Sequence, residues 1–321
     1  MRFIVVGAGA IGGTLAAQLH VTGQDVEVVA RGDHLDAIRS GGLVRVAPDG
    51  RAVAHVRAHA QVSDAVIDDD TVVVLATKVH QVEPVLDELL AHAGPDVPVA
   101  CVHNGVEGER LAARRFRRVH GVLINVPGVH LTPGEVQVFA TAPRGVLDIG
   151  RWPSGVDDTT RAIADAWTRA EFLSEACEDV MARKWAKLLG NVGNVLQVLC
   201  GTDREGWDQL YERVRDEAEA VVAAAGITVD AATQQHRAQL VARADIGDVR
   251  RPGGSTWQSA VRGQPVETTA LNGEICLLGR LHGVPTPAND LVQAEALALV
   301  AAGDPIGSRD QAALLARLDT G

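Results

Sequence analysis

The chain has 321 residues, of which 46% are hydrophobic, and its formal net charge is −11 at pH 7. This length allows two domains with a substantial core, and the hydrophobic fraction is ordinary for a soluble globular protein. The acidic balance argues against a nucleic-acid partner, and no apolar stretch approaches the roughly 20 residues of a membrane span. The first predicted strand begins at residue 2, so we expect no signal peptide. Four widely spaced cysteines without a metal-ligand pattern indicate reduced thiols, no metal and a cytoplasmic protein.

The first predicted strand, residues 2–6, ends in a glycine-rich turn. A helical stretch and a second strand at residues 24–30 follow. Strand, GxGxxG, helix and strand in this order are typical of a dinucleotide-binding Rossmann domain. The first glycine permits the tight turn, the second lets the backbone approach the pyrophosphate, and the third lets the helix pack on the strand. The predicted cofactor-binding residues of this turn are Gly7, Ala8, Gly9, Ala10, Ile11 and Gly12.

The end of the second strand indicates which dinucleotide binds. NAD-binding domains usually place a carboxylate there for the ribose 2′-hydroxyl, but here the strand ends in Ala30-Arg31-Gly32. The guanidinium of Arg31 suits a 2′-phosphate by its charge and by its paired hydrogen bonds. We therefore predict NADP(H) as the cofactor.

Two further apolar runs, residues 71–76 and 97–102, read as buried parallel strands. Lys78 and Gln81 follow the first run, and His103 and Asn104 follow the second. Ligands of open α/β sheets bind beyond the carboxyl ends of the strands. Lys78, Gln81 and Asn104 are therefore predicted to line the cofactor and substrate crevice.

The pattern changes along the rest of the chain. Shorter alternating strands at 119–125, 135–140 and 145–149 are expected to extend the same sheet with antiparallel strands, and helical spacing dominates from about residue 156 onward. Predicted helices cover residues 159–168, 179–199, 206–225, 231–242, 267–282 and 290–302. The predicted fold class is α/β, with a Rossmann-type NADP-binding domain over 1–172, an all-α substrate domain over 173–321, and the active site in the cleft between them.

The predicted helix around residues 184–199 carries unusual polar residues. Only three of the 30 basic residues are lysines, and two of them, Lys184 and Lys187, lie here. Asn191 and Asn194 follow Lys187 by four and seven positions, so the three side chains share one helical face. Unlike arginine, a desolvated lysine releases its proton near neutral pH and acts as an acid or a base.

These motifs resemble, in order and over nearly the whole chain, those of the ketopantoate reductase (2-dehydropantoate 2-reductase) family. The turn at Gly7–Gly12 and Ala30-Arg31-Gly32 look like its NADPH site, Lys78-Val79-His80-Gln81 like its Lys-x-x-Gln turn, and His103-Asn104-Gly105 like its Asn-Gly turn. The stretch from Trp185 to Asn191 resembles its Trp-x-Lys-Leu-x-x-Asn helix, and Ser255 with Glu267 its substrate-binding pair.

The resemblance implies NADPH-dependent reduction of a 2-oxo acid, ketopantoate to pantoate, with Lys187 as the general acid and Glu267 as a second catalytic residue. Asn104, Asn191 and Asn194 would bind the substrate, and Ser255 and Glu267 its distal part. We expect desolvation and a neighbouring cation, Lys184 or Lys78, to lower the pKa of Lys187 from about 10.4 toward 7–8. His103 is the rival proton donor.

Two departures from the family pattern touch the substrate side. The second asparagine of the helix usually lies four residues after the first and precedes a proline, whereas here Asn194 lies three residues after Asn191 and Val195-Leu196 follow. Thr269 replaces a usual acidic residue. A reductase of another 2-oxo acid or ketone, and a non-catalytic NADP(H)-binding sensor, are the alternatives. The expected partner is a small 2-oxo acid, and self-association into a homodimer is left open.

Overall fold

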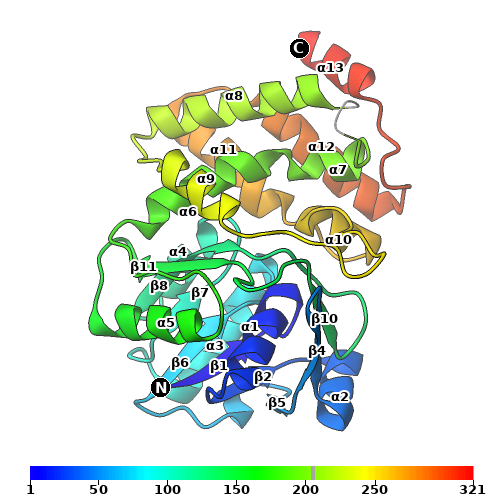
Figure 1. The fold of residues 1–321 in the computed structure, drawn as a ribbon. Helices are drawn as coiled ribbons and strands as arrows, with labels where there is room; N and C mark the ends of the chain where they lie inside the picture. Colours follow the sequence, from blue (N-terminus) through cyan, green and yellow to red (C-terminus); the bar gives the residue numbers. More distant parts are fainter. Residues whose placement is uncertain (204–206, 321) are drawn as a thin grey trace. The chain divides into compact units, whose positions relative to one another are not determined.

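The structure, a computed structural model, describes residues 1–203 and 207–320 (Figure 1). The chain forms two compact units. Unit 1 contains residues 1–184 and 231–251, and unit 2 contains residues 185–230 and the chain from residue 252 onward. The division of function between residues 1–172 and 173–321 stays a prediction. None of the described helices has both the length and the apolar character that crossing a bilayer requires.

Unit 1 is built on a seven-stranded sheet in the order β11-β8-β7-β6-β1-β2-β5. All neighbours in it are parallel except β11, which runs antiparallel to β8. Its strands are β1 (Arg2–Val6), β2 (Val26–Val29), β5 (Arg57–His59), β6 (Thr71–Leu75), β7 (Val99–Cys101), β8 (Val119–Asn125) and β11 (Val146–Arg151). Their apolar runs are buried on both faces, as in parallel sheets covered by helices.

A second, four-stranded sheet has the order β4-β3-β10-β9. Its strands are β3 (Leu43–Ala47), β4 (Gly50–Ala54), β9 (Gly128–Val129) and β10 (Glu135–Val138). The expectation that the late strands all extend the first sheet in antiparallel fashion is therefore wrong for two of them. β8 pairs in parallel with β7, and β10 lies in the second sheet, parallel to β3. β11 is antiparallel in the first sheet, as predicted.

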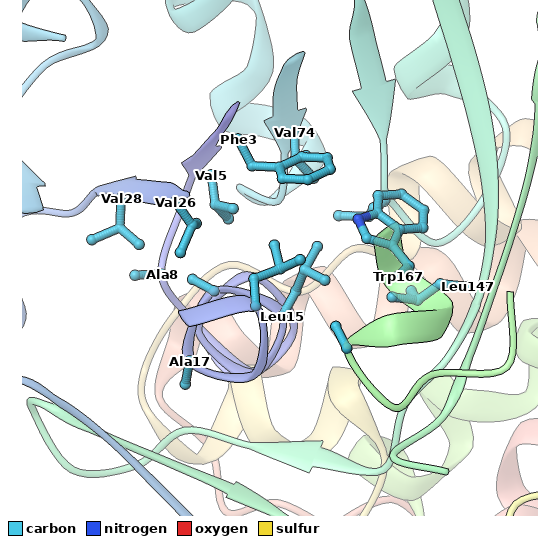
Figure 2. Packing of buried hydrophobic residues seen from close by; sticks show 14 of the residues in the cluster. Phe3, Val5, Ala8, Leu15, Ala17, Val26, Val28, Val74, Leu147 and Trp167 are labelled. Carbon is cyan, nitrogen blue, oxygen red and sulfur yellow. The ribbon is translucent and has the colours of Figure 1, made fainter. Parts of the chain in front are cut away.

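Unit 1 also contains helices. They are α1 (Ala10–Val21), α2 (Gly32–Gly41), α3 (Val82–Ala93), α4 (Glu107–Ala113), α5 (Asp158–Arg169) and α9 (Ala231–Gln239), with 3₁₀ turns η1 (Val62–Asp64) and η2 (Val79–Gln81). One buried cluster joins α1 and α5 to the sheet, and Figure 2 shows Leu15 of α1 and Trp167 of α5 in this cluster with Phe3 of β1. Leu15 and Trp167 are at most 1% exposed.

The segment 231–251 belongs to unit 1 because of a buried ion-pair network. Asp148 of β11, which is fully buried, accepts hydrogen bonds from Arg237 Nε of α9 at 2.9 Å and from Arg183 Nη1 at 2.9 Å. Arg183 also pairs with Glu175 at 2.5 Å. Burial raises the pKa of Asp148, and the two arginines oppose that rise. A backbone bridge between Ala140 and Arg243 adds a second attachment.

Unit 2 is helical. The chain enters it within α6 (Val180–Asn191) and continues through η3 (Val192–Val195), α7 (Leu196–Leu199), α8 (Asp208–Ala224), α10 (Ser255–Val261), α11 (Thr268–His282), α12 (Pro287–Ala302) and α13 (Gln311–Asp319). One buried cluster drawn from η3, α7, α8, α11 and α12 forms its core. The predicted start of a helix at Gly206 lies outside the described residues. α10 and α13 were not predicted.

Candidate active site

Four neighbouring parallel strands end level with one another in unit 1. Val6 of β1 pairs with Val29 of β2 and with Leu75 of β6, and Leu75 pairs with Cys101 of β7. The predicted cofactor residues follow these strand ends, namely the glycine turn after β1, Arg31 after β2, Lys78 and Gln81 after β6, and Asn104 after β7. The sheet thus brings four separate sequence motifs to one edge, the edge at which α/β sheets bind ligands.

The three glycines of the turn have different surroundings. Gly7 has a φ of +100°, and a Cβ placed on it would lie 2.7 Å from the backbone nitrogen of Thr77. A Cβ on Gly12 would lie 2.0 Å from the carbonyl oxygen of Gly7, whereas a Cβ on Gly9 would meet nothing within 4 Å. Gly7 and Gly12 therefore permit close backbone packing, and the open side at Gly9 leaves room for a ligand.

The same turn begins helix α1, with Gly9 at its N-cap and no acidic residue in the first turn. Free amides and the helix dipole make such an end favourable for an anion. Ala8 is buried, Ile11 packs partly against the core, and the carbonyl of Ala10 accepts the Thr14 hydroxyl at 2.6 Å. A Cβ on Gly128 of β9 would lie 2.7 Å from that carbonyl oxygen, so the second sheet packs directly on the turn.

Arg31 lies at the N-cap of α2 and is exposed. The carboxylate inside β2, Glu27, is buried and occupied by an ion pair with Arg57 at 2.8 Å and by a hydrogen bond with His59 Nε2 at 2.5 Å. Asp33 lies in the first turn of α2 and is exposed. Arg31 is thus the first exposed charged residue after the end of β2, and Asp33 follows it two positions later.

Lys78 and Gln81 form one short turn beside the glycine turn. Lys78 is the N-cap of η2, and its backbone nitrogen donates to Gln81 Oε1 at 3.4 Å. Because Thr77, the preceding residue, packs against Gly7, this turn and the glycine turn are neighbours in unit 1. Both side chains are predicted cofactor ligands, and the structure places them at the same edge.

A buried ion pair lies next to the chain segment that leads into Asn104. Lys184 Nζ lies 2.7 Å from Glu109 Oε1 and donates to the carbonyl oxygens of His103 at 2.9 Å and Val122 at 3.1 Å. Lys184 is 3% exposed and Glu109 is fully buried. The charge of Lys184 is therefore matched by Glu109, and this lysine holds the turn before Asn104. Its expected effect on the pKa of Lys187 stays a prediction.

His103, the rival proton donor, is buried, and a Cβ on Gly108 of α4 would lie 2.4 Å from its Nδ1. The ring is thus packed against the first turn of α4. This placement favours a packing role for His103.

In unit 2 the predicted polar stripe changes helix type partway along. Lys187 and Asn191 lie four residues apart in α6, on one face. The chain then tightens to the 3₁₀ turn η3, in which side chains three residues apart eclipse. Asn194 therefore returns to the face of Asn191. Asn191, Asn194 and Gln197 are half-buried, whereas Val195 is 1% exposed and belongs to the core.

The segments that carry Ser255 and Glu267 are both anchored near this stripe, within unit 2. Gln197 Oε1 accepts the backbone nitrogen of Gly254, the residue before Ser255, at 2.8 Å. Glu267 is the N-cap of α11 and is 8% exposed. One turn further, Asn272 Nδ2 donates to the carbonyl oxygen of Val192 at 2.9 Å.

Sequence reasoning missed three residues that contact these segments: Glu109, Gln197 and His34, whose Nε2 lies 2.8 Å from the carbonyl oxygen of Ala8 in the glycine turn. His34, Glu109 and Gln197 form contacts with residues distant in sequence, and only Gln197 carried a signal, its spacing three residues after Asn194. Gly193, next to the stripe, leaves room for the ring of Tyr211. A hollow of about 650 Å³ near His20 and Arg57 lies at the amino ends of β2 and β5, the opposite sheet edge. The described residues contain no cluster of His, Cys, Asp or Glu able to hold a metal.

Comparison with known proteins assigns the family. Residues 3–154 match the family described as ketopantoate reductase PanE/ApbA, and residues 179–299 match its C-terminal part. A 2-dehydropantoate 2-reductase from Mesorhizobium japonicum is 31% identical over 326 aligned positions, which cover 92% of this chain and 96% of that protein.

Solved structures agree in fold. A PanE/ApbA family ketopantoate reductase from Ralstonia eutropha JMP134 superimposes with a TM-score of 0.77 at 23% identity, over 94% of this chain and 98% of that one. A ternary structure of D-mandelate dehydrogenase with NADH and anilino(oxo)acetate gives a TM-score of 0.78 at 20% identity, over 94% and 99% of the chains.

A Rossmann-type unit with a glycine-rich turn and a helical unit with a Lys-Asn stripe define a two-unit oxidoreductase that acts on a CH–OH/C=O pair. The chain belongs to the ketopantoate reductase family. This confirms the resemblance found in the sequence.

Proposed function

We propose that this protein reduces a 2-oxo acid with NADPH, and that the acid is ketopantoate, which becomes pantoate. The observation that carries the proposal is the row of motifs at the level ends of β2, β1, β6 and β7, in a chain whose family is known. The Lys-Asn-Asn stripe of unit 2 supports the same reaction. Asn194 lies one residue nearer to Asn191 than the family spacing has it, but the 3₁₀ turn η3 returns its side chain to the face of Asn191.

The residues at the sheet edge fit a dinucleotide. The free amides at the start of α1 would bind its pyrophosphate, with Gly9 leaving room for the close approach. Arg31 would bind the 2′-phosphate that distinguishes NADPH from NADH, and Lys78 and Gln81 would lie beside it. When bound, the reduced nicotinamide supplies a hydride to the keto carbon.

Lys187 would hold the proton that completes the reaction. As the carbonyl carbon gains the hydride, its oxygen becomes an alkoxide, and Lys187 Nζ donates one proton to form the hydroxyl; water then returns a proton to the lysine. Asn104 and Asn191 would orient the carboxylate and the carbonyl of the substrate. Ser255 and Glu267 would bind the distal hydroxyl of ketopantoate, with Asn194 beside them on the stripe.

The test is the decay of NADPH absorbance when purified protein meets ketopantoate, with NADH in parallel. We expect decay with NADPH that exceeds decay with NADH. Replacing Lys187 by Ala should lower turnover roughly 10²–10⁴-fold, the contribution of a positioned general acid. Lys187→Arg is the matched control, because it keeps the positive charge but does not release a proton near neutral pH.

The outcomes separate the parts of the proposal. Near-normal turnover in either Lys187 variant would remove the lysine from the mechanism. Tight NADPH binding without turnover on ketopantoate would leave the cofactor assignment standing and point to another 2-oxo acid or to a sensor. Equal rates with NADH would overturn the role of Arg31.

A further inference from the structure

The ring of His34 joins the glycine turn to the second sheet. His34 lies in the first turn of α2, three residues after Arg31. Its Nε2 is 2.8 Å from the carbonyl oxygen of Ala8, and its Nδ1 accepts the backbone nitrogen of Gly134 at 2.8 Å. The His130 ring packs beside it, with centroids 4.3 Å apart.

The two partners fix the protonation state of the ring. A carbonyl oxygen only accepts, so Nε2 carries a hydrogen, and a backbone N–H only donates, so Nδ1 is unprotonated. The ring is therefore neutral, with its proton on Nε2. Burial lowers the pKa of His34, which favours the same neutral form, although the bond to Ala8 opposes the shift.

The Gly134 end of this link is rigid. Gly134 has a φ of +77°, and a Cβ on it would lie 2.9 Å from Cβ of Ala37 in α2. Its carbonyl oxygen accepts the backbone nitrogen of Val44 in β3 at 2.8 Å. Gly134 is thus held through both its N–H and its C=O, and the His34 ring links it to Ala8.

The Ala8 end decides where an amide points. The C=O of Ala8 and the N–H of Gly9 belong to one planar trans peptide and point in opposite directions. Holding the Ala8 oxygen toward α2 therefore turns the Gly9 N–H away from α2. Gly9 is also the position whose surroundings are open, so its amide is the one a phosphate would approach most closely.

We propose that His34 is a positioning residue for the dinucleotide, because its Nε2–H bond to Ala8 orients the Gly9 amide toward the pyrophosphate. The proposal rests on the dinucleotide function proposed above. His34 itself touches no substrate atom; it acts through the Ala8–Gly9 peptide.

Two substitutions separate the two bonds of the ring. The side-chain nitrogen of Gln reaches about as far as Nε2, so His34→Gln keeps a donor for Ala8 and loses the acceptor for Gly134. The side-chain oxygen of Asn lies where Nδ1 lies, so His34→Asn keeps the acceptor and loses the donor. Each variant removes one neutral hydrogen bond, so we expect similar melting temperatures for the pair.

The readout is the Kd for NADPH and NADP⁺, measured by calorimetric titration of the full-length protein. We expect His34→Asn to weaken binding roughly two- to twelve-fold, the range of one lost hydrogen bond, and His34→Gln to restore most of that loss. In turnover assays the KM for NADPH should rise in His34→Asn, with kcat and the KM for ketopantoate unchanged.

Equal Kd values in the two variants, or His34→Asn binding as tightly as the unaltered protein, would overturn the role of His34 and leave the proposed function intact. Unaltered protein that binds neither NADPH nor NADH would overturn both. If a variant fails to fold, the proposal can still be tested on the unaltered protein by NMR. The ¹⁵N resonance of His34 Nε2 should be that of a protonated nitrogen and should move on saturation with NADP⁺, and an unmoved resonance would contradict the proposal.

Discussion

At the scale of single residues, the glycines of the turn have two different roles, close packing of the backbone and access for a ligand. Gly12 is needed because backbone atoms already fill the space where a Cβ would go, and Gly9 is needed only if something outside the protein comes close. The first role concerns folding and the second concerns binding, so substitutions at the two positions should have different effects.

We expect Gly12→Ala to destabilise the protein by roughly 1–3 kcal/mol, because its methyl group would overlap the Gly7 carbonyl and force the backbone apart. Gly9→Ala is the matched control. Its φ of −70° suits alanine, so stability should stay near that of the unaltered protein while NADPH binding weakens. Urea unfolding and dinucleotide titration of both variants check this, and a destabilised Gly9→Ala with normal binding would reverse the assignment.

Lys184 shows that a rare lysine in a functional helix need not be catalytic. Its ammonium is buried next to the turn before Asn104, with Glu109 as its counter-ion. Lys184→Met should cost roughly 3–5 kcal/mol, the usual result of leaving a buried charge without its partner. Adding Glu109→Leu should recover part of this loss, and denaturant unfolding of the single and double variants measures it. No recovery in the double variant would mean that the bonds to the two carbonyls, and not the ion pair, carry the stability.

Sequence reasoning placed the residues that follow strands and missed those that act across the fold. Gly7, Arg31, Lys78 and Asn104 could be located because strand and turn patterns are local. His34 could not, because its partners lie 26 and 100 positions away and nothing in its own neighbourhood marks it. The same holds for Glu109, whose partner Lys184 belongs to α6.

At the scale of elements, the change from α6 to η3 accounts for the shifted asparagine. In a continuous α-helix the usual amide position would be residue 195, but here Val195 packs in the core of unit 2. The 3₁₀ turn has three residues per turn, so Asn194, three residues after Asn191, lies on the face that residue 195 would occupy in a continuous α-helix. The departure in sequence and the departure in helix type compensate each other.

We expect Asn194→Ala to lower kcat/KM for the 2-oxo acid with little change in melting temperature, because Asn194 is half-buried and outside the core. Val195→Asn restores the family spacing in sequence, yet it should fail to rescue Asn194→Ala and should cost roughly 1–3 kcal/mol, because it buries an amide. Steady-state kinetics and thermal unfolding of the double variant decide. A rescued double variant would show that residue 195 reaches the substrate.

The positions of the strands and helices were predicted better than the pairing of the strands. Strand β10 alternates buried and half-buried residues, which suits a strand with one buried face in either sheet, and alternation carries no information about the pairing strand. The hairpin β3–β4 is half-exposed and short, and α10 has only seven residues, so neither produces a long periodic signal. The long helices of unit 2 were recognised because their apolar spacing persists over several turns.

At the scale of the whole molecule, the fold class and family were predictable because each half has its own periodicity. The assignment of residues 231–251 was not. Helix α9 contains no buried residue, so its sequence gives no indication of which core it serves. Its place in unit 1 comes from the ion pairs of Arg237 with the buried Asp148 of β11 and with Glu175, and from the backbone bridge between Ala140 and Arg243.

Arg237→Met should therefore destabilise the protein by roughly 1.5–3 kcal/mol, the range for hydrogen bonds to a charged group, with Arg183 still pairing Asp148. Amide hydrogen exchange across residues 231–251 should accelerate in this variant. Arg250→Met is the control on the same segment, because Arg250 is 91% exposed and its pair with Asp245 spans 3.9 Å. Unchanged exchange in Arg237→Met would assign the attachment to the backbone bridge at Ala140.

The return of the chain to unit 1 also has a consequence for synthesis. Domains commonly fold as they leave the ribosome, N-terminal part first. Here unit 1 lacks one of the two arginine partners of Asp148 until Arg237 has been made, by which time the first stretch of unit 2 has already emerged. A nascent chain halted before that point would carry an incomplete charge network, so we expect unit 1 to complete its packing only after residues 185–230 of unit 2 have been synthesised.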